Sequence, residues 1–247
     1  MPDTRLGLML YTVRDECARD FPATLREVAA IGFEGVELFD LHGRTAAEVA
    51  GVLDETGLVA CGRHASLEAI EAGLPELAAE ADELGWRRLV VSWVDPASLG
   101  AALVGRLEAA AGDAAQRGLE LGFHNHDAEV RPLEGGRSFL DELLAGEELF
   151  LELDLGWAWY AGVDPIDLLG SARGRCPLVH VKDFHGREGR AFAPVGDGVV
   201  GYERVAPAAI EAGVEWLLIE QDETDGPSLA AARRSLDALR GMLGVTA

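Results

Sequence analysis

The chain has 247 residues, of which 49% are hydrophobic and 26% charged, a balance typical of one globular domain rather than a disordered chain. Its formal net charge of −22 argues against a nucleic acid partner and an anionic membrane surface, because both require basic patches. The sequence shows no membrane-spanning apolar stretch, no basic signal-peptide start and only three widely spaced cysteines, so we expect a cytoplasmic protein without disulfides.

Short apolar runs alternate with longer amphipathic stretches along the whole chain. The apolar runs, which predict strands, are 6–10, 35–39, 58–64, 87–93, 119–124, 149–154, 177–181 and 216–220. The amphipathic stretches, which predict helices, are 22–31, 45–56, 66–84, 97–117, 137–145, 164–172, 201–212 and 227–243. Eight strand–helix units in this length predict a single (β/α)8 TIM barrel, with residues 1–247 as one domain. A doubly wound sheet is the alternative, but the first strand lacks the glycine-rich phosphate loop that usually follows it.

All six histidines lie at or just beyond the carboxyl end of a predicted strand. They are His42, His64, His124, His126, His180 and His185. In a TIM barrel the carboxyl ends of the strands form one rim, where active sites are built. A lone histidine at a strand end is usually a hydrogen-bonding loop residue, but six at one rim favour a functional site.

Acidic residues also end two of the apolar runs. Asp154 ends the sixth predicted strand and Glu220 the eighth, while Glu37 lies in the second. A carboxylate that ends a buried strand is costly unless it is paired or bound to a cation. With His180 on the seventh strand, Asp154 and Glu220 predict a site for one divalent ion of manganese, iron, cobalt or zinc. The alternative is that both carboxylates form salt bridges at the rim.

Lys182 is the only lysine in the sequence and lies two residues after His180. If the strand continues that far, alternation places both side chains on the same face. A lysine there can stabilise a developing enolate oxygen or bind an anionic group of the substrate. Alternatively, Lys182 forms a structural ion pair with Asp183 or with a rim carboxylate.

Several phrases of the sequence resemble those of a known family. They are the opening LGLMLYTVRDECARDF and, further on, GFHNHDAEV, LELDLGWAWYAGVDP, LVHVKDFHG and EWLLIEQDE. In this order they are similar to the xylose isomerase-like TIM barrels known as sugar phosphate isomerases/epimerases, over nearly the whole chain. The resemblance implies one divalent metal ion on strands five to eight. Its expected ligands are His124, Asp154, His180 and Glu220.

The fifth strand departs from the family pattern, which usually has a glutamate where this chain has His124. Only Glu220 is then left of the acid–base pair that the resemblance implies. His124 or His126 can act as the base instead, and Glu129 is a further candidate unless it is an exposed loop charge. The predicted catalytic residues are Glu220, His126, Lys182 and Glu129. The rim residues predicted to bind substrate are His64, Trp93, Trp157 and Asp183.

These residues predict a metal-dependent sugar isomerase or epimerase that removes a proton next to the carbonyl of a small keto-sugar or polyol. The alternative is a metal-dependent 3-keto-glycoside lyase or hydrolase, or a keto-inositol dehydratase, which starts with the same proton abstraction. The expected partner is a small-molecule carbohydrate, and homo-oligomerisation is left open. A related DNA-repair endonuclease is disfavoured by the net charge, and metal content would distinguish an enzyme from a non-catalytic binding protein.

Overall fold

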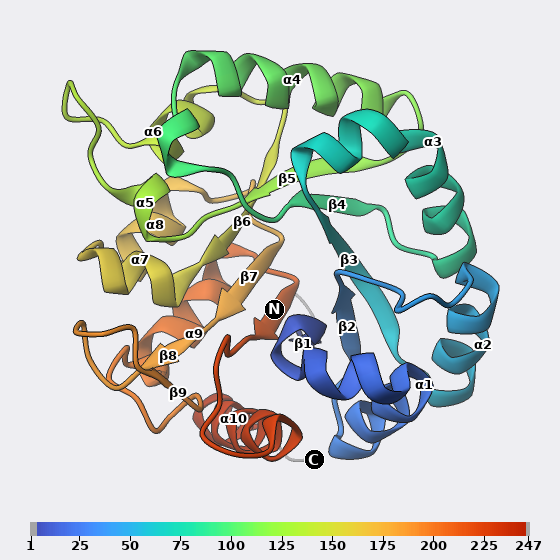
Figure 1. Cartoon of the computed structure of the whole chain (residues 1–247). Coiled ribbons are helices and arrows are strands. Elements are labelled where there is room, and N and C mark those ends of the chain that lie inside the picture. Colours follow the sequence, from blue (N-terminus) through green and yellow to red (C-terminus); the bar gives the residue numbers. More distant parts are fainter. Residues whose placement is uncertain (1–3, 246–247) are drawn as a thin grey trace.

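The computed structural model describes residues 4–245, and its central feature is a closed barrel of eight parallel strands surrounded by helices (Figure 1). The barrel strands are β1 (Arg5–Met9), β2 (Gly35–Leu38), β3 (Val59–Ala65), β4 (Arg88–Val91), β5 (Glu120–His124), β6 (Phe150–Asp154), β7 (Leu178–Val181) and β10 (Trp216–Ile219). Strand β1 pairs with both β2 and β10, which closes the barrel. The predicted single (β/α)8 TIM barrel is confirmed, while the ends of the predicted 1–247 domain lie outside the described residues.

Eight helices follow the barrel strands in the expected order. They are α1 (Arg14–Ile31), α2 (Ala46–Thr56), α3 (Leu67–Leu84), α4 (Ala101–Ala115), α6 (Phe139–Ala145), α8 (Pro165–Ser171), α9 (Tyr202–Ala212) and α10 (Ser228–Leu243). Helix α1 begins at Arg14, before the predicted start at residue 22. Asp20 interrupts it with non-helical backbone, and its side chain accepts the N–H of Ala23, so the predicted start corresponds to the second segment of α1.

Shorter elements between these units were not predicted. They are the 3-10 helices η1 (Leu10–Val13) and η2 (Pro96–Ser98), the helices α5 (Asp127–Val130) and α7 (Leu155–Ala161), and the hairpin strands β8 (Asp183–Phe184) and β9 (Phe192–Ala193). Three of them, α5, α7 and the β8–β9 hairpin, directly follow barrel strands β5, β6 and β7. They therefore lie at the rim where the predicted site residues are placed.

The barrel interior changes character along its axis. Apolar side chains from four strands pack together in one cluster, as is usual inside a TIM barrel; they are Cys61, Val90, Leu178, Trp216 and Leu218. Closer to the carboxyl ends of the strands, buried ionisable side chains take the place of apolar ones; they are Glu37, His64, Glu152 and His180. The described residues include no helix that is long and apolar enough to span a bilayer.

Candidate metal centre

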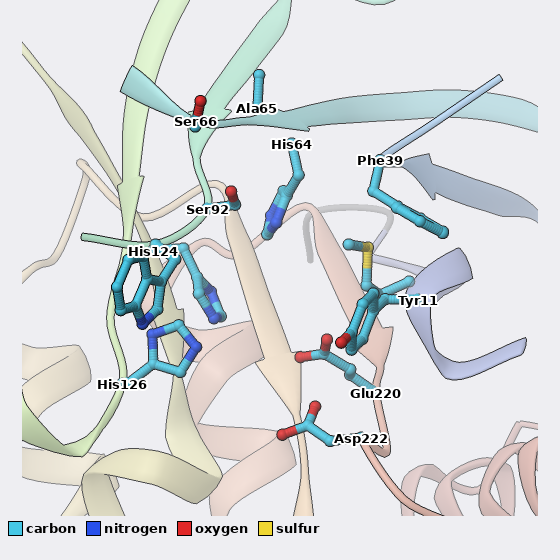
Figure 2. A pocket seen from close by; sticks show the side chains of 12 residues that line it. Tyr11, Phe39, His64, Ala65, Ser66, Ser92, His124, His126, Glu220 and Asp222 are labelled. Carbon is cyan, nitrogen blue, oxygen red and sulfur yellow. The ribbon is translucent and has the colours of Figure 1, made fainter. Parts of the chain in front are cut away.

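A cavity of about 440 Å³ opens at the carboxyl ends of the barrel strands (Figure 2). Its lining consists of Met9, Tyr11, Phe39, His64, Ala65, Ser66, Ser92, Trp93, His124, His126, Glu220 and Asp222. Figure 2 shows imidazole rings of the lining on one side of the cavity and the carboxylates of Glu220 and Asp222 on another. The cavity therefore combines metal-ligand chemistry with aromatic surface.

Four buried side chains gather at this rim with one potential ligand atom each. They are His124, Asp154, His180 and Glu220, and their ligand atoms all lie within 4.8 Å of one another. The arrangement follows from the sheet, since Asp154 on β6 pairs with His180 on β7 and both side chains point into the barrel. Two imidazoles and two carboxylates suit a divalent ion of the zinc or manganese group. The cluster could therefore hold a metal ion.

Asp154 shows how well the donor set fits a cation. Its Oδ1 accepts the backbone N–H of Trp157 at 2.7 Å and caps α7. Its Oδ2 is buried and accepts no hydrogen bond from the described residues, although Lys182 Nζ lies 3.3 Å away. Burial raises the pKa of the Asp154 carboxyl to about 6, against the opposing charges of Lys182 and His180. A buried oxygen without a hydrogen-bond donor is expensive, and a metal ion would satisfy it.

His180 lies between carboxylates on both of its ring nitrogens. Nδ1 is 2.8 Å from Glu220 Oε2, and Nε2 is 2.7 Å from Glu37 Oε2. Burial alone would lower the pKa of His180, but the carboxylates of Glu152 and Glu220 outweigh it and raise that pKa well above its usual range. The ring is thus surrounded by negative charge, and Nδ1 faces the metal-ligand cluster.

Lys182 lies in the same cluster, on the side of the strand that the sequence predicted. Its Nζ is 2.8 Å from Asp222, 2.9 Å from Glu220 and 3.3 Å from Asp154. Burial opposes its charge, but these carboxylates raise the pKa of Lys182 above its usual value, so the side chain is an ammonium. The backbone is tightly packed here, because a Cβ at Gly156 would lie 2.0 Å from Lys182 O.

His126 and Glu129, the other predicted catalytic candidates, have different surroundings. His126 lines the cavity, and burial together with the nearby Lys182 ammonium lowers its pKa to about 4, so the ring is neutral at neutral pH. Glu129 is buried, and its Oε2 accepts the backbone N–H of His126 at 2.9 Å. His126 therefore faces the cavity, whereas Glu129 does not line it and caps the start of α5.

The four residues predicted to bind substrate separate into two pairs. His64 and Trp93 line the cavity, and Trp93 is 57% exposed. Trp157 is buried with its ring 5.1 Å from Lys182 Nζ. Asp183 points to the loop after β9, where its carboxylate accepts the backbone N–H groups of Gly196, Gly198 and Val200. Neither of this second pair lines the cavity, nor do the rim histidines His42 and His185.

Sequence reasoning missed several residues of the site. Glu152 precedes Asp154 by two residues, and Asp222 follows Glu220 by two, so strand alternation alone could have placed both on the inner face. Tyr11 and Phe39 follow β1 and β2 and line the aromatic part of the cavity. Their signal is weaker, because aromatic residues after a strand are usually ordinary packing residues.

Comparisons with known proteins agree with this fold. A sugar phosphate isomerase/epimerase from Parabacteroides distasonis superposes with a TM-score of 0.78 at 17% identity, covering 98% of this chain and 94% of that chain. The probable 3-DHS dehydratase from Bacillus anthracis superposes with a TM-score of 0.75 at 15% identity, covering 94% of this chain and 98% of that chain. The 3-keto-D-glucoside 4-epimerase from E. coli superposes with a TM-score of 0.69 at 16% identity, covering 96% of this chain and 99% of that chain. A search of curated proteins found no match.

At these identities the structural likeness shows the shared barrel and not a shared reaction. The family comparison goes further, because the model described as xylose isomerase-like TIM barrel matches residues 25–242. That range contains the four ligand-type residues and both flanking acidic positions, Glu152 and Asp222. The chain belongs to the xylose isomerase-like TIM barrel family.

Proposed function

We propose that this protein is a divalent-metal-dependent isomerase or epimerase that acts on a small, uncharged keto-sugar or polyol. The observation that carries the proposal is the convergence of His124, Asp154, His180 and Glu220 beside an accessible cavity, with a buried Asp154 oxygen that lacks a hydrogen-bond donor. These four residues would hold the ion. A divalent ion bound here would polarise adjacent carbonyl and hydroxyl oxygens of the substrate and acidify the intervening C–H.

The chain's own residues supply proton transfer and charge stabilisation. His126 lines the cavity as a neutral imidazole, so it can accept the proton from the carbon next to the carbonyl. The Lys182 ammonium does not itself line the cavity, but it holds the Asp222 and Glu220 carboxylates that do and adds positive charge to the site. Return of the proton to the neighbouring atom gives isomerisation, and return to the opposite face of the same carbon gives epimerisation.

The charge of the cavity favours an uncharged substrate. No arginine of the described chain lines it, and Lys182 already has three carboxylates within 3.3 Å. Apart from the proposed metal ion, a phosphate group would meet Glu220 and Asp222 with no free cationic side chain to neutralise it, which is costly in a partly desolvated site. Tyr11, Phe39 and Trp93 instead offer aromatic faces to the apolar C–H faces of a sugar ring or to an aglycone.

A lyase is the second candidate, and His124 in place of the strand-five glutamate favours it. That replacement leaves one carboxylate, Glu220, where a symmetrical acid–base pair would need two. In the lyase reaction the same C–H proton passes to His126, its electron pair forms a C=C bond, and the bond to the β-oxygen breaks. The departing hydroxide or alkoxide takes up a proton and leaves as water or an alcohol. The dehydratase and the 3-keto-glucoside epimerase among the structural relatives make such substrates reasonable to test.

One experiment distinguishes these candidates. Manganese-loaded protein is incubated in D2O with methyl 3-keto-β-D-glucoside, 2-keto-myo-inositol and D-fructose, and the products are followed by NMR. Deuterium next to the carbonyl without elimination supports the isomerase or epimerase, whereas loss of methanol or water supports the lyase. His126→Gln is expected to slow the exchange by about 100-fold, the scale of general base catalysis. Absence of exchange and of elimination with all three compounds would contradict the proposal.

A further inference from the structure

A second group of ionisable side chains is buried in the barrel below the candidate metal centre. It consists of Glu37 on β2, His64 on β3 and Glu152 on β6, and each of these residues is at most 5% exposed. TIM-barrel interiors are usually filled by branched apolar residues, and burying two carboxylates is costly unless they have partners. None of these three residues belongs to the four ligands, so their presence requires another explanation.

Their contacts lead to the two histidine ligands. Glu37 Oε2 lies 2.7 Å from His180 Nε2, on the side of the ring opposite Nδ1 and the metal-ligand cluster. Glu152 Oε2 lies 3.5 Å from His124 Nδ1 and 3.4 Å from His180 Nε2. Glu37 therefore hydrogen-bonds the inner nitrogen of His180, whereas Glu152 lies near both rings and hydrogen-bonds His64 instead.

His64 connects the two carboxylates. Its Nε2 is 2.5 Å from Glu152 Oε2 and 3.2 Å from Glu37 Oε2. Its ring stacks on that of His180, with centroids 5.3 Å apart and planes at 9°. His64 thus fixes the positions of both carboxylates and packs against the ring that Glu37 contacts.

Gly62 provides the space that Glu37 occupies. A Cβ at position 62 would lie 2.7 Å from Glu37 Oε1, so a larger residue would displace the carboxylate from its place beside His180. The chain therefore combines a buried acid on β2 with a matching glycine on the adjacent strand β3.

We propose that Glu37, His64 and Glu152 form a buried positioning network that fixes the tautomer and orientation of His180 for metal binding. The proposal rests on the proposed function, since it needs a metal at the rim. A metal-bound neutral imidazole keeps one N–H, and acceptance by Glu37 places it on His180 Nε2, leaving the Nδ1 lone pair for the metal. Carboxylates that accept the second N–H of a ligand histidine commonly change metal affinity 10–100-fold.

A second ion in the barrel is the competing explanation. His64, His124, Glu152 and His180 also place one potential ligand atom each within 4.8 Å of one another. That set shares His124 and His180 with the rim centre, so two ions at once would require both rings to bind metal through both nitrogens. Positioning needs only one metal bond from each ring, and we therefore assign the deeper group to positioning.

The test compares metal binding of the full chain with that of two variants. Zn²⁺ affinity and stoichiometry are measured at pH 7 by competition with a chelator of known affinity. One ion per wild-type chain and a 10–100-fold loss in Glu37→Gln are expected. The control Glu55→Gln, which alters an exposed ion pair with Arg26 between α1 and α2, is expected to remain within twofold. Two ions per chain, or a Glu37→Gln affinity within twofold of wild type, would overturn the proposal.

A measurement on the wild-type protein covers the case in which Glu37→Gln does not fold. ¹⁵N NMR of the zinc-loaded chain is expected to show His180 protonated on Nε2 and zinc-bound through Nδ1. The opposite tautomer contradicts the positioning network but leaves the metal centre intact. If the wild-type chain binds no Zn²⁺ or Mn²⁺ at all, both the positioning network and the proposed function fail.

Discussion

Replacement of Lys182 by methionine tests the charge balance of the site most sharply. The Lys182 ammonium contacts Asp154, Glu220 and Asp222, at 3.3, 2.9 and 2.8 Å. Methionine keeps an unbranched chain of similar length but removes the charge. Three carboxylates then remain close together, two of them in the buried part of the rim.

The expected cost follows from the burial of the pair. Breaking a buried ion pair by removing one partner typically costs about 3–5 kcal/mol, because the remaining charge loses its compensation. We expect Lys182→Met to lower the free energy of unfolding of the metal-free protein by about this amount. A bound divalent ion restores positive charge beside Asp154 and Glu220, so the same substitution should cost less in the metal-loaded protein.

The assay is urea denaturation of wild type and Lys182→Met, each with a chelator and with saturating manganese. Arg26→Met is a control, because Arg26 forms an exposed ion pair with Glu55 that water and salt screen, so its loss should leave the stability close to that of wild type. A metal-free Lys182→Met protein within about 1 kcal/mol of wild type would refute the reasoning. So would an equal loss of stability with and without manganese.

Three further predictions concern pH, substrate binding and the rim loop. The carboxylates of Glu37 and Glu152 outweigh burial and raise the pKa of His64 to about 9, above its ordinary value of 6.5. Protonated His64 therefore stabilises the metal-free protein fully below about pH 6.5, and this stabilisation, on the order of 3 kcal/mol, is lost as the pH rises through 9. Urea denaturation at several pH values should show the loss of stability, and His64→Gln should make it smaller. Trp93→Ala should raise KM for a glycoside substrate several-fold with kcat within twofold, since this exposed ring only offers a binding face; steady-state kinetics showing a fall in kcat alone would contradict that role. Asp183→Ala should destabilise the protein by about 3 kcal/mol, because several backbone N–H groups of the loop lose their acceptor. If the amides of Gly196, Gly198 and Val200 exchange hydrogen in the variant as slowly as in wild type, this role of Asp183 is contradicted.

The barrel and its rim could be predicted because they follow from strand order and alternation. Asp154, His180 and Glu220 each lie at the carboxyl end of an apolar run, and parallel strands bring such ends together. The position of Lys182 beside Glu220 also followed from its spacing to His180. Asp154 and His180 lie within their strands, and Glu220 and Lys182 directly follow β10 and β7, so strand order places these parts of the site.

Other parts depend on short irregular elements, which periodicity does not reveal. Trp157 was expected at the substrate, but α7 begins directly after Asp154 and turns the indole into packing against Phe184. Asp183 was expected there too, but it belongs to the β8–β9 hairpin and holds the following loop. Glu152 was not predicted as a site residue, because it lies inside β6, two residues before the strand ends at Asp154.

The central claim is that one divalent ion binds between strands β5, β6, β7 and β10. A crystal structure of the zinc-soaked protein, with anomalous scattering measured at the zinc edge, tests this directly. We predict one strong anomalous peak at about 2.0–2.2 Å from side-chain atoms of His124, Asp154, His180 and Glu220. A peak within the deeper Glu37–His64–Glu152 group, or no peak in the barrel at saturating zinc, would contradict it.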